Sequence, residues 1–376
     1  MTRDASPPPT RPVLATLPAY RAGRLPEPVP GLTAYKISSN ENPYPPLPGV
    51  LAAVHAAAER MNRYPDMANT ALRTALSNYL GVPMEMIACG TGSVAVLGHI
   101  IDAMCDAGDE VIYAWRSFEA YPIAIALAGA FSVQVPLTPD HRHDLHAMAA
   151  SITETTKVIL VCTPNNPTGT IVTDTELRDF LAVVPPRVLV VIDEAYLEFG
   201  TDPEAPDALA ILRDHPNVVV LRTFSKAYGL AGLRVGYAVA HPDIAEALRM
   251  TATPFGVNLV AQEAAIASLA ARDDLQVRVK ELVAERDRVE AALAEQGWVL
   301  PPSQANFVWF PLGEQTPDFA AACEEQALTV RPYASDGVLA TICESAACER
   351  LLEITAAWRA RAATEEVEPA AAVPGP

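Results

Sequence analysis

The chain has 376 residues, of which 50% are hydrophobic and 19% are charged. It is therefore large enough for two or three domains, and it can bury a core that needs no disulfides or structural metals to be stable. Its 45 acidic and 27 basic residues give a formal net charge of −18. The resulting field repels phosphate backbones and anionic membranes, so we expect neither nucleic acid nor a membrane as a partner.

Cysteine usage and the apolar runs indicate a cytoplasmic protein. The six cysteines are scattered, with no Cys-x-x-Cys pair, which favours reduced thiols. The first nine residues lack the apolar segment of a signal peptide, and the longest apolar run, near 123–131, is shorter than the ~18 residues of a membrane span.

Both ends of the chain are rich in Pro, Ala and Glu, which predicts disordered tails. Between them we expect an N-terminal segment that joins a small domain, then a large domain, and then the small domain itself. The predicted divisions are 1–12 (tail), 13–45 (N-terminal segment), 46–272 (large domain), 273–362 (small domain) and 363–376 (tail).

In the large domain, short apolar runs alternate with helical patterns. Buried runs of this kind, separated by helices, predict an α/β fold with a mostly parallel sheet that helices cover on both faces. The expected strands are 109–113, 157–162, 188–193, 217–221 and 235–240, and the expected helices include 94–107, 174–181 and 205–213.

Beyond residue 254 the pattern changes to a smaller α+β domain. A long charged helix over 273–296 precedes a Phe-Val-Trp-Phe strand at 307–310. Two more helices are expected at 318–325 and 346–361.

Ligands of such sheets bind at the carboxyl ends of the strands, so the residues after each strand are candidates for chemistry. Gly90-Thr-Gly-Ser93 opens a helix, where free backbone amides can bind phosphate, although an ordinary glycine turn is equally compatible. Thr163-Pro-Asn-Asn-Pro-Thr-Gly169 is dense in turn formers. Asp193 stands at the tip of a buried strand, where it needs a cation, and Tyr196 follows three residues later.

Lysine is scarce, and elimination singles out one position. Lys36 lies in the N-terminal segment, Lys157 opens a strand and Lys280 belongs to a charged helix. Lys226 alone lies in an apolar, glycine-rich loop, where desolvation lowers the pKa of an amine and makes it a nucleophile. A Schiff-base lysine, a strand-tip aspartate and a phosphate cradle together predict a site for pyridoxal 5'-phosphate.

Several segments carry a family resemblance. The loop at 163–169, Val191-Ile-Asp-Glu-Ala-Tyr196 and the run from Arg222 to Arg234 resemble the motifs of fold type I, class I and II aminotransferases. Further segments are similar to histidinol-phosphate and aromatic amino acid aminotransferases, and the resemblance covers about 17–358. These segments are Ser39-Asn-Glu-Asn-Pro43, Arg63-Tyr-Pro-Asp66, Gly92-Ser-Val-Ala95, Arg116-Ser-Phe-Glu-Ala-Tyr121 and Gln304-Ala-Asn-Phe-Val308.

The resemblance implies a fold type I transferase that acts as a homodimer on an amino acid or amine. Lys226 would bind the cofactor and move the proton at the substrate Cα, and Asp193 would keep the pyridine nitrogen protonated. Tyr196 and Asn166 would hydrogen-bond the ring hydroxyl, and Phe118 would stack on the ring face. The phosphate would be held by the amides of Gly92 and Ser93, by Ser225 and Arg234, and by Tyr64 from the neighbouring subunit. Tyr20 would line the substrate pocket.

One position departs from the family pattern. Relatives typically read Gly-Val-Arg-Val-Thr-Ile-Gly, with the arginine on the substrate carboxylate, whereas this chain reads Gly337-Val-Leu-Ala-Thr-Ile-Cys343. Leu339 cannot replace a bidentate arginine, and Arg331 is a candidate for recruitment to that task. Transamination, action on an amine or bulky conjugate, and carbon–sulfur β-elimination or decarboxylation therefore stay open.

Three further hypotheses carry less weight. His141-Arg-His-Asp-Leu-His146 has ligand-rich spacing, but its polar surroundings favour a solvated loop over a metal site. A pseudoenzyme is disfavoured because the cofactor residues are complete. A cofactor-binding regulator would need a basic DNA-binding module, for which the chain has no spare segment.

Overall fold

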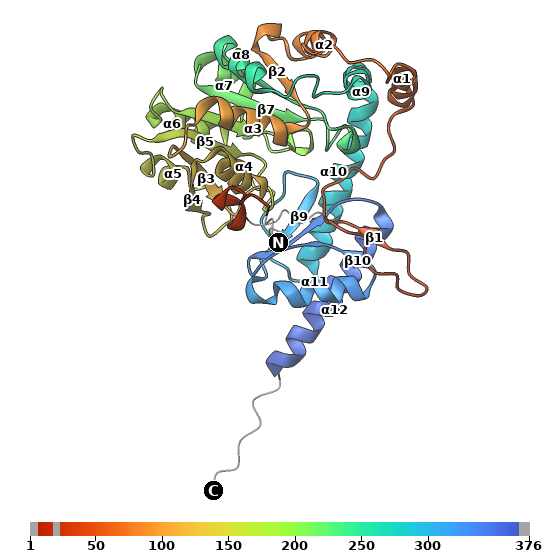
Figure 1. Ribbon diagram of the computed structural model, residues 1–376. Coiled ribbons are helices and arrows are strands. Elements are labelled where there is room, and N and C mark those ends of the chain that lie inside the picture. The colour runs from red at the N-terminus through yellow and green to blue at the C-terminus, as the bar shows by residue number, and fades with distance from the viewer. Residues whose placement is uncertain (1–6, 18–22, 368–376) are drawn as a thin grey trace, which may run out of the picture.

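A seven-stranded sheet forms the large lobe of the computed structural model, which describes residues 7–17 and 23–367 (Figure 1). The strand order is β2-β8-β7-β6-β5-β3-β4, and the pairs are parallel except for β8, which is antiparallel to both neighbours. The strands are β2 (Ile87–Gly90), β3 (Glu110–Trp115), β4 (Phe131–Pro136), β5 (Thr156–Cys162), β6 (Leu189–Asp193), β7 (Val218–Thr223) and β8 (Gly236–Ala240).

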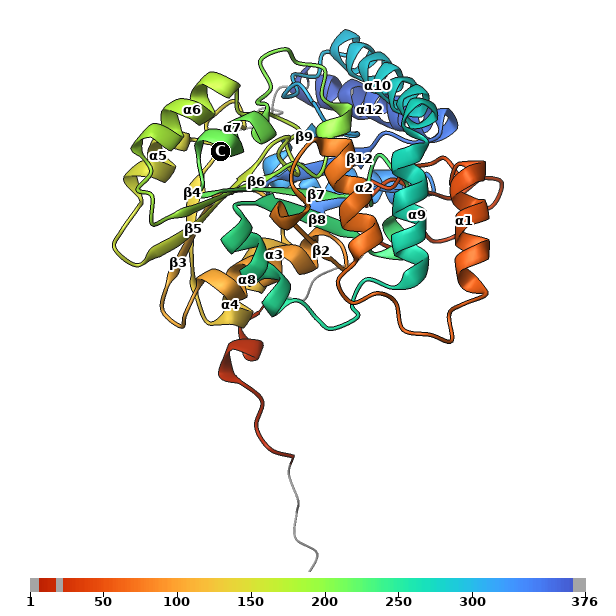
Figure 2. The same ribbon diagram turned by 90° about the horizontal axis from the view of Figure 1, so that it is seen from above.

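Helices cover both faces of this sheet (Figure 2). Alternate residues of β6 enter different cores: Val190 and Ile192 join one cluster, and Leu189 and Val191 join the other. One face is covered by α3 (Ser93–Met104), α4 (Ala120–Ala128) and α8 (Pro242–Thr251). The other is covered by α2 (Thr70–Leu80), α5 (Leu145–Ala150), α6 (Asp174–Val183), α7 (Ala208–Asp214) and α9 (Leu259–Ala270), with α1 (Pro48–Ala58) packed on α9.

Three strands differ from the expectation of a mostly parallel sheet with five strands: β2 and β4 are additional, and β8 is antiparallel. β8 runs antiparallel because 224–235 holds only a short 3-10 turn, and a parallel return needs a longer crossover. β4 was not predicted, since as an edge strand it leaves much of its surface, including Phe131, in solvent.

The small lobe combines β1, from the N-terminal part of the chain, with the C-terminal part (Figure 1). β1 (Tyr35–Lys36) pairs with β10 (Leu328–Thr329), and β12 (Gly337–Thr341) lies between β11 (Arg331–Tyr333) and β9 (Phe307–Phe310) in an antiparallel sheet. Its helices are α11 (Thr316–Glu325) and α12 (Ser345–Val367), and α10 (Arg272–Glu295) joins the two lobes.

The C-terminal helix extends further than predicted. We expected a tail from residue 363, but α12 continues to Val367, because the Ala- and Glu-rich sequence there favours helix. α7 begins at Ala208 rather than at the expected residue 205, because the Asp207 side chain caps the helix by accepting a hydrogen bond from the amide of Ala210. The domain divisions given above stay a prediction.

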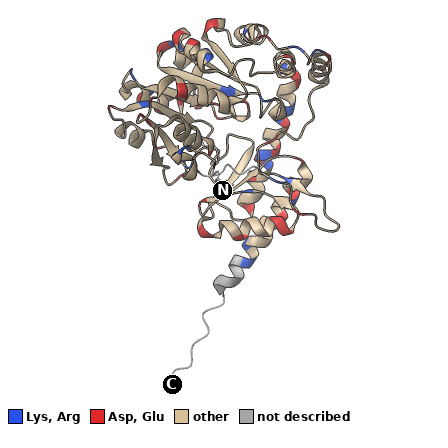
Figure 3. Cartoon of the chain, in the orientation of Figure 1, with Lys and Arg blue, Asp and Glu red and all other residues tan. Residues whose placement is uncertain are grey.

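Charged positions are spread over both lobes in Figure 3, where the basic residues lie singly among acidic ones. Within 7–17 and 23–367, no helix has the length and apolar character needed to cross a bilayer.

Candidate active site

The carboxyl ends of β5, β6 and β7 meet at the edge of the large sheet that faces the small lobe. The loops that follow these strands enclose a cavity of about 240 Å³. Ten of the residues singled out in the sequence line it: Ser93, Phe118, Asn166, Asp193, Tyr196, Ser225, Lys226, Arg234, Arg331 and Leu339. Chain segments far apart in sequence thus converge as the strand-end argument predicts.

Lys226 points its amine into this cavity. Its Nζ donates a hydrogen bond to the carbonyl of Ser39 at 3.0 Å and lies 5.6 Å from the centre of the Tyr196 ring. Burial lowers the pKa of this amine to about 8, against the opposing effect of the Glu41 carboxylate. A neutral, nucleophilic fraction of the amine is therefore present near neutral pH.

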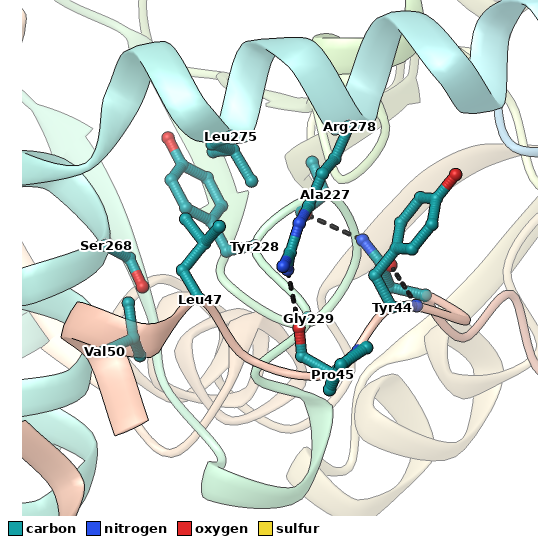
Figure 4. Close-up of a pocket in the computed structure, with 11 residues that line it drawn as sticks. Tyr44, Pro45, Leu47, Val50, Ala227, Tyr228, Gly229, Ser268, Leu275 and Arg278 are labelled. Carbon is teal, nitrogen blue, oxygen red and sulfur yellow. Dashed lines mark hydrogen bonds between the residues drawn. The ribbon is translucent and has the colours of Figure 1, made fainter. Parts of the chain in front are cut away.

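The back of the lysine loop is tightly packed (Figure 4). Asn42 donates its amide to the carbonyl of Ala227 at 2.9 Å, and Arg278 from α10 donates to the carbonyl of Pro45. The space between these residues is only about 10 Å³. The N-terminal segment and α10 thus hold the loop so that Lys226 faces the other way, into the larger cavity.

Asp193 is buried at the tip of β6, and its two oxygens have different surroundings. Oδ2 accepts a hydrogen bond from the Tyr121 hydroxyl at 2.7 Å, whereas Oδ1 has no partner within the part of the chain that the structure describes. Burial raises the pKa of this carboxyl to about 6, and the Tyr121 bond opposes that rise. A cationic N–H group in the cavity would supply the missing partner.

A second set of polar groups surrounds the Tyr196 hydroxyl. Its oxygen accepts hydrogen bonds from Asn40 Nδ2 at 2.9 Å and Asn166 Nδ2 at 3.3 Å. Asn166 in turn accepts from the Tyr333 hydroxyl at 3.2 Å. Because the two amides occupy the lone pairs of Tyr196, its own O–H proton is directed to another acceptor.

The N-terminus of α3 forms an anion cradle. Ser93, the first residue of α3, has no acceptor for its amide within the helix, and Arg234 Nη1 donates to Ser225 Oγ at 3.3 Å beside it. Gly92 plays a different part from the one expected, since its amide already donates to the carbonyl of Gly90 at 2.8 Å. With φ at +85°, Gly92 instead leaves the space that Arg234 occupies, which a Cβ atom would fill.

The histidine-rich segment supports the 163–169 loop rather than lying wholly in solvent. His143 is buried, and its Nε2 lies 3.1 Å from Asn165 Oδ1, which also accepts from Ser117 Oγ. Burial lowers the pKa of His143 to about 4, so the ring is neutral. The prediction of a solvated loop is therefore wrong for this residue, because its ring is buried against the 163–169 loop and its Nε2 contacts Asn165.

On the small-lobe side, Leu339 and Arg331 lie opposite each other on β12 and β11. Leu339 is 1% exposed. Arg331 Nη2 lies 2.5 Å from Oε2 of Glu119, the residue that precedes α4. The carboxylate-binding position of the family pattern is thus apolar here, and the nearby guanidinium has an internal partner.

One predicted residue lies elsewhere. Tyr64 is 82% exposed, stacks on Phe255 with the ring centres 4.7 Å apart, and does not line this cavity. Tyr20 lies outside the described residues.

Three residues that contact the predicted site residues were not predicted from the sequence: Asn40, Glu119 and Tyr121. Each lies within a segment quoted for the family resemblance, which is the signal that could have identified them. Their roles come from contacts 72 to 212 residues away, which no local pattern contains.

Chemically, the cavity presents a weakly basic amine, an unpartnered buried carboxylate oxygen and an anion cradle in one enclosed space. These groups fit a ligand with an anionic end and a basic ring nitrogen.

Known proteins share this organisation. A model of the family described as aminotransferase class I and II matches residues 34–366. The chain is 58% identical over 352 residues to an aromatic amino acid aminotransferase of Streptomyces avermitilis, which covers 94% of this chain and 98% of that protein. An aromatic amino acid aminotransferase of Thermobifida fusca is 52% identical, with 90% and 94% covered.

Among solved structures, a histidinol-phosphate aminotransferase from Sinorhizobium meliloti in complex with pyridoxal-5'-phosphate is similar, with a TM-score of 0.79 and 30% identity over 86% of this chain and 91% of that chain. A Thermus thermophilus aspartate aminotransferase variant shares the fold, with a TM-score of 0.74 and 23% identity over 85% and 95% of the two chains. The matched range includes Asp193 at the end of β6 and Lys226 in the loop after β7, so the chain belongs to the class I and II aminotransferases.

Proposed function

We propose that the protein is a homodimeric, pyridoxal-phosphate-dependent aminotransferase of aromatic amino acids. The observation that carries the reaction is the 58% identity to an aromatic amino acid aminotransferase over nearly the whole of both chains. Asp193 Oδ1 supports the cofactor, because it is buried without a donor among the described residues and a protonated pyridine nitrogen is the kind of donor that it lacks.

The residues of the cavity fit the parts of the cofactor. Ser93, Ser225 and Arg234 would hold its phosphate, and Phe118 would cover the ring face. Asp193 would hold a proton on the ring nitrogen. When bound, the cofactor supplies an electron-accepting ring that stabilises negative charge developing at the substrate Cα.

Three side chains would then handle protons. Lys226, with its pKa lowered to about 8, would take the proton from the substrate Cα and return it. Tyr196 would donate its hydroxyl to the ring oxygen, since its lone pairs are occupied by Asn40 and Asn166. The Tyr121 bond would keep Asp193 ionised, so that the ring proton stays on nitrogen.

The test of the reaction is to supply phenylalanine or tyrosine with and without 2-oxoglutarate and to measure the aromatic oxo acid. We expect product only with the oxo acid, and none from Lys226→Ala. Products without 2-oxoglutarate would instead support elimination or decarboxylation, the alternatives that Leu339 leaves open. Purified protein that neither contains nor takes up the cofactor would contradict the proposal.

The homodimer is supported by an exposed apolar patch. It comprises Met61, Tyr64, Met67 and Phe255, which are 72%, 82%, 58% and 40% exposed. A patch of this kind is typical of a contact surface. Tyr64, whose ring lies against Phe255, would reach the phosphate of the partner subunit.

A complementation experiment tests this arrangement. Lys226→Ala and Tyr64→Ala homodimers should each have impaired activity, and mixing them with exchange of subunits should restore it. The mixed dimer holds one site with Lys226 from one subunit and Tyr64 from the other. A monomer by sedimentation, or no recovery despite subunit exchange, would contradict the dimer.

A further inference from the structure

An aromatic amino acid brings an α-carboxylate into a cavity where the apolar side chain of Leu339 lines the small-lobe side beside Arg331 and Tyr333. An ion cannot be left against such a wall without a partner. Three cationic side chains line the cavity within 7–17 and 23–367: Lys226, Arg234 and Arg331. Lys226 carries the chemistry and Arg234 lies at the anion cradle, so Arg331 is left for the carboxylate.

The strand register places Arg331 where it can do this. Its Cα is the direct partner of the Leu339 Cα in the antiparallel pair β11–β12, so the two side chains leave the sheet on the same face as neighbours. The Arg331 side chain is 13% exposed, which strengthens a charge-assisted hydrogen bond in that space. An arginine there can extend over the leucine toward the cavity.

The guanidinium already holds a carboxylate. Glu119 Oε2 lies 2.5 Å from Arg331 Nη2, and Glu119 also lines the cavity. The Glu119 carboxylate is chemically the same group as the substrate carboxylate, and it competes for the same positive charge.

We propose that Arg331 is the receptor for the substrate α-carboxylate, and that Glu119 is a positioning residue that occupies this receptor in the resting enzyme and sets its affinity. The inference rests on the proposed function and goes beyond it by assigning the carboxylate subsite. Arg331 has five N–H donors, so the incoming carboxylate displaces Glu119 or shares the guanidinium with it. In either case the Glu119 charge weakens substrate binding without touching the reacting atoms.

The experiment uses the holoenzyme and two inhibitors of nearly the same shape, 3-phenylpropanoate, which carries the carboxylate, and 3-phenylpropanamide, in which a neutral amide replaces it. Arg331→Met should weaken inhibition by the carboxylate at least about tenfold, the effect of one lost hydrogen bond to a charged group. Glu119→Gln should tighten it severalfold and lower the KM for phenylalanine while kcat stays the same. Inhibition by the amide should change by less than twofold in both variants.

A second experiment asks whether carboxylate inhibition can be restored in the Arg331→Met variant. Leu339→Arg places a guanidinium on the neighbouring strand, so it should restore carboxylate inhibition in the Arg331→Met background. Should Arg331→Met fail to fold, Glu119→Gln still tests the inference, since removing the charge that competes for Arg331 should tighten inhibition by the carboxylate and not by the amide.

Three results would overturn the inference. They are equal inhibition by the carboxylate in wild type and Arg331→Met, no selective effect of Glu119→Gln, and equal turnover of phenylalanine and 2-phenylethylamine by the wild type. Failure of the proposed function is distinguishable, because the wild type would then transaminate no aromatic amino acid at all.

Discussion

Replacing Asp193 with asparagine should stabilise the apoprotein while weakening its hold on the cofactor. The carboxyl is buried, and its Oδ1 has no partner in the described part of the chain. The variant removes the charge but keeps an oxygen that can accept the Tyr121 hydrogen bond. It therefore isolates the cost of holding one buried negative charge without its cation.

The magnitude follows from the pKa. Burial raises the pKa of Asp193 from its ordinary value of 3.8 to about 6, a shift of about 2 units. At 1.36 kcal/mol per unit, this corresponds to about 3 kcal/mol. Because the folded chain binds this proton more tightly than the unfolded chain, stability is lost as the pH rises from about 4 to about 6, and it stays lost above that.

The assay is urea denaturation of the apoproteins from pH 4 to pH 8. Asp193→Asn should match the wild type near pH 4 and exceed its free energy of unfolding by about 3 kcal/mol above pH 6. With pyridoxal phosphate added, the wild type should become the more stable of the two proteins, because only its Asp193 carries a charge that pairs with the ring nitrogen. Asp179→Asn makes the same substitution at an exposed position on α6 and is the matched control, so it should leave the free energy of unfolding close to that of the wild type.

A difference between the Asp193 variant and the wild type that stays constant between pH 4 and pH 8 would refute this reasoning. So would a less stable apo variant at pH 8.

Three other substitutions test the surroundings of the site. Tyr121→Phe removes a hydrogen bond worth about 1.5–3 kcal/mol, so the pKa of Asp193 should rise by about 1–2 units and the cofactor dissociation constant, measured by equilibrium titration against pH, should rise about tenfold or more. Gly92→Ala should weaken cofactor binding in the same titration because a Cβ atom would meet the cradle arginine, whereas Gly98→Ala in the open part of α3 should not. Arg222→Met leaves a buried carboxylate unpaired and should lower the free energy of unfolding in urea by about 3–5 kcal/mol.

Each of these predictions has a contradicting result. An unchanged pH profile in Tyr121→Phe would mean that its hydroxyl does not support the ionised aspartate. Equal cofactor affinity in the two glycine variants would exclude the proposed crowding. For Arg222→Met, the double variant with Glu194→Gln should recover stability, and no recovery would show that the loss has another cause.

Much of the fold and of the cofactor set could be predicted because the evidence is local. The buried apolar runs predict strands, and Asp193 and Lys226 were identified by what immediately surrounds them in the sequence. The antiparallel β8 could also have been derived, since its connection to β7 is too short for a crossover helix. The edge strand β4 carries a local signal as well, the alternation of apolar and polar residues in Phe131-Ser-Val-Gln-Val135.

The partners of those residues required the tertiary structure. Tyr121 contacts Asp193 across 72 residues, Asn40 contacts Tyr196 across 156, and Arg331 contacts Glu119 across 212. A sequence shows which residue types are present, but it does not show which of several acids, amides or phenols a folded chain brings within hydrogen-bond distance.

The substitution at Leu339 illustrates the division most clearly. The sequence alone determined that the usual arginine is absent and that Lys226 and Asp193 are the candidates for the chemistry. Only the fold decided that Arg331 lies in register beside this leucine with Glu119 on its guanidinium. The physical reason is that strand register and the packing of the two lobes set charge pairing in three dimensions, whereas residue spacing along the chain sets only the local element.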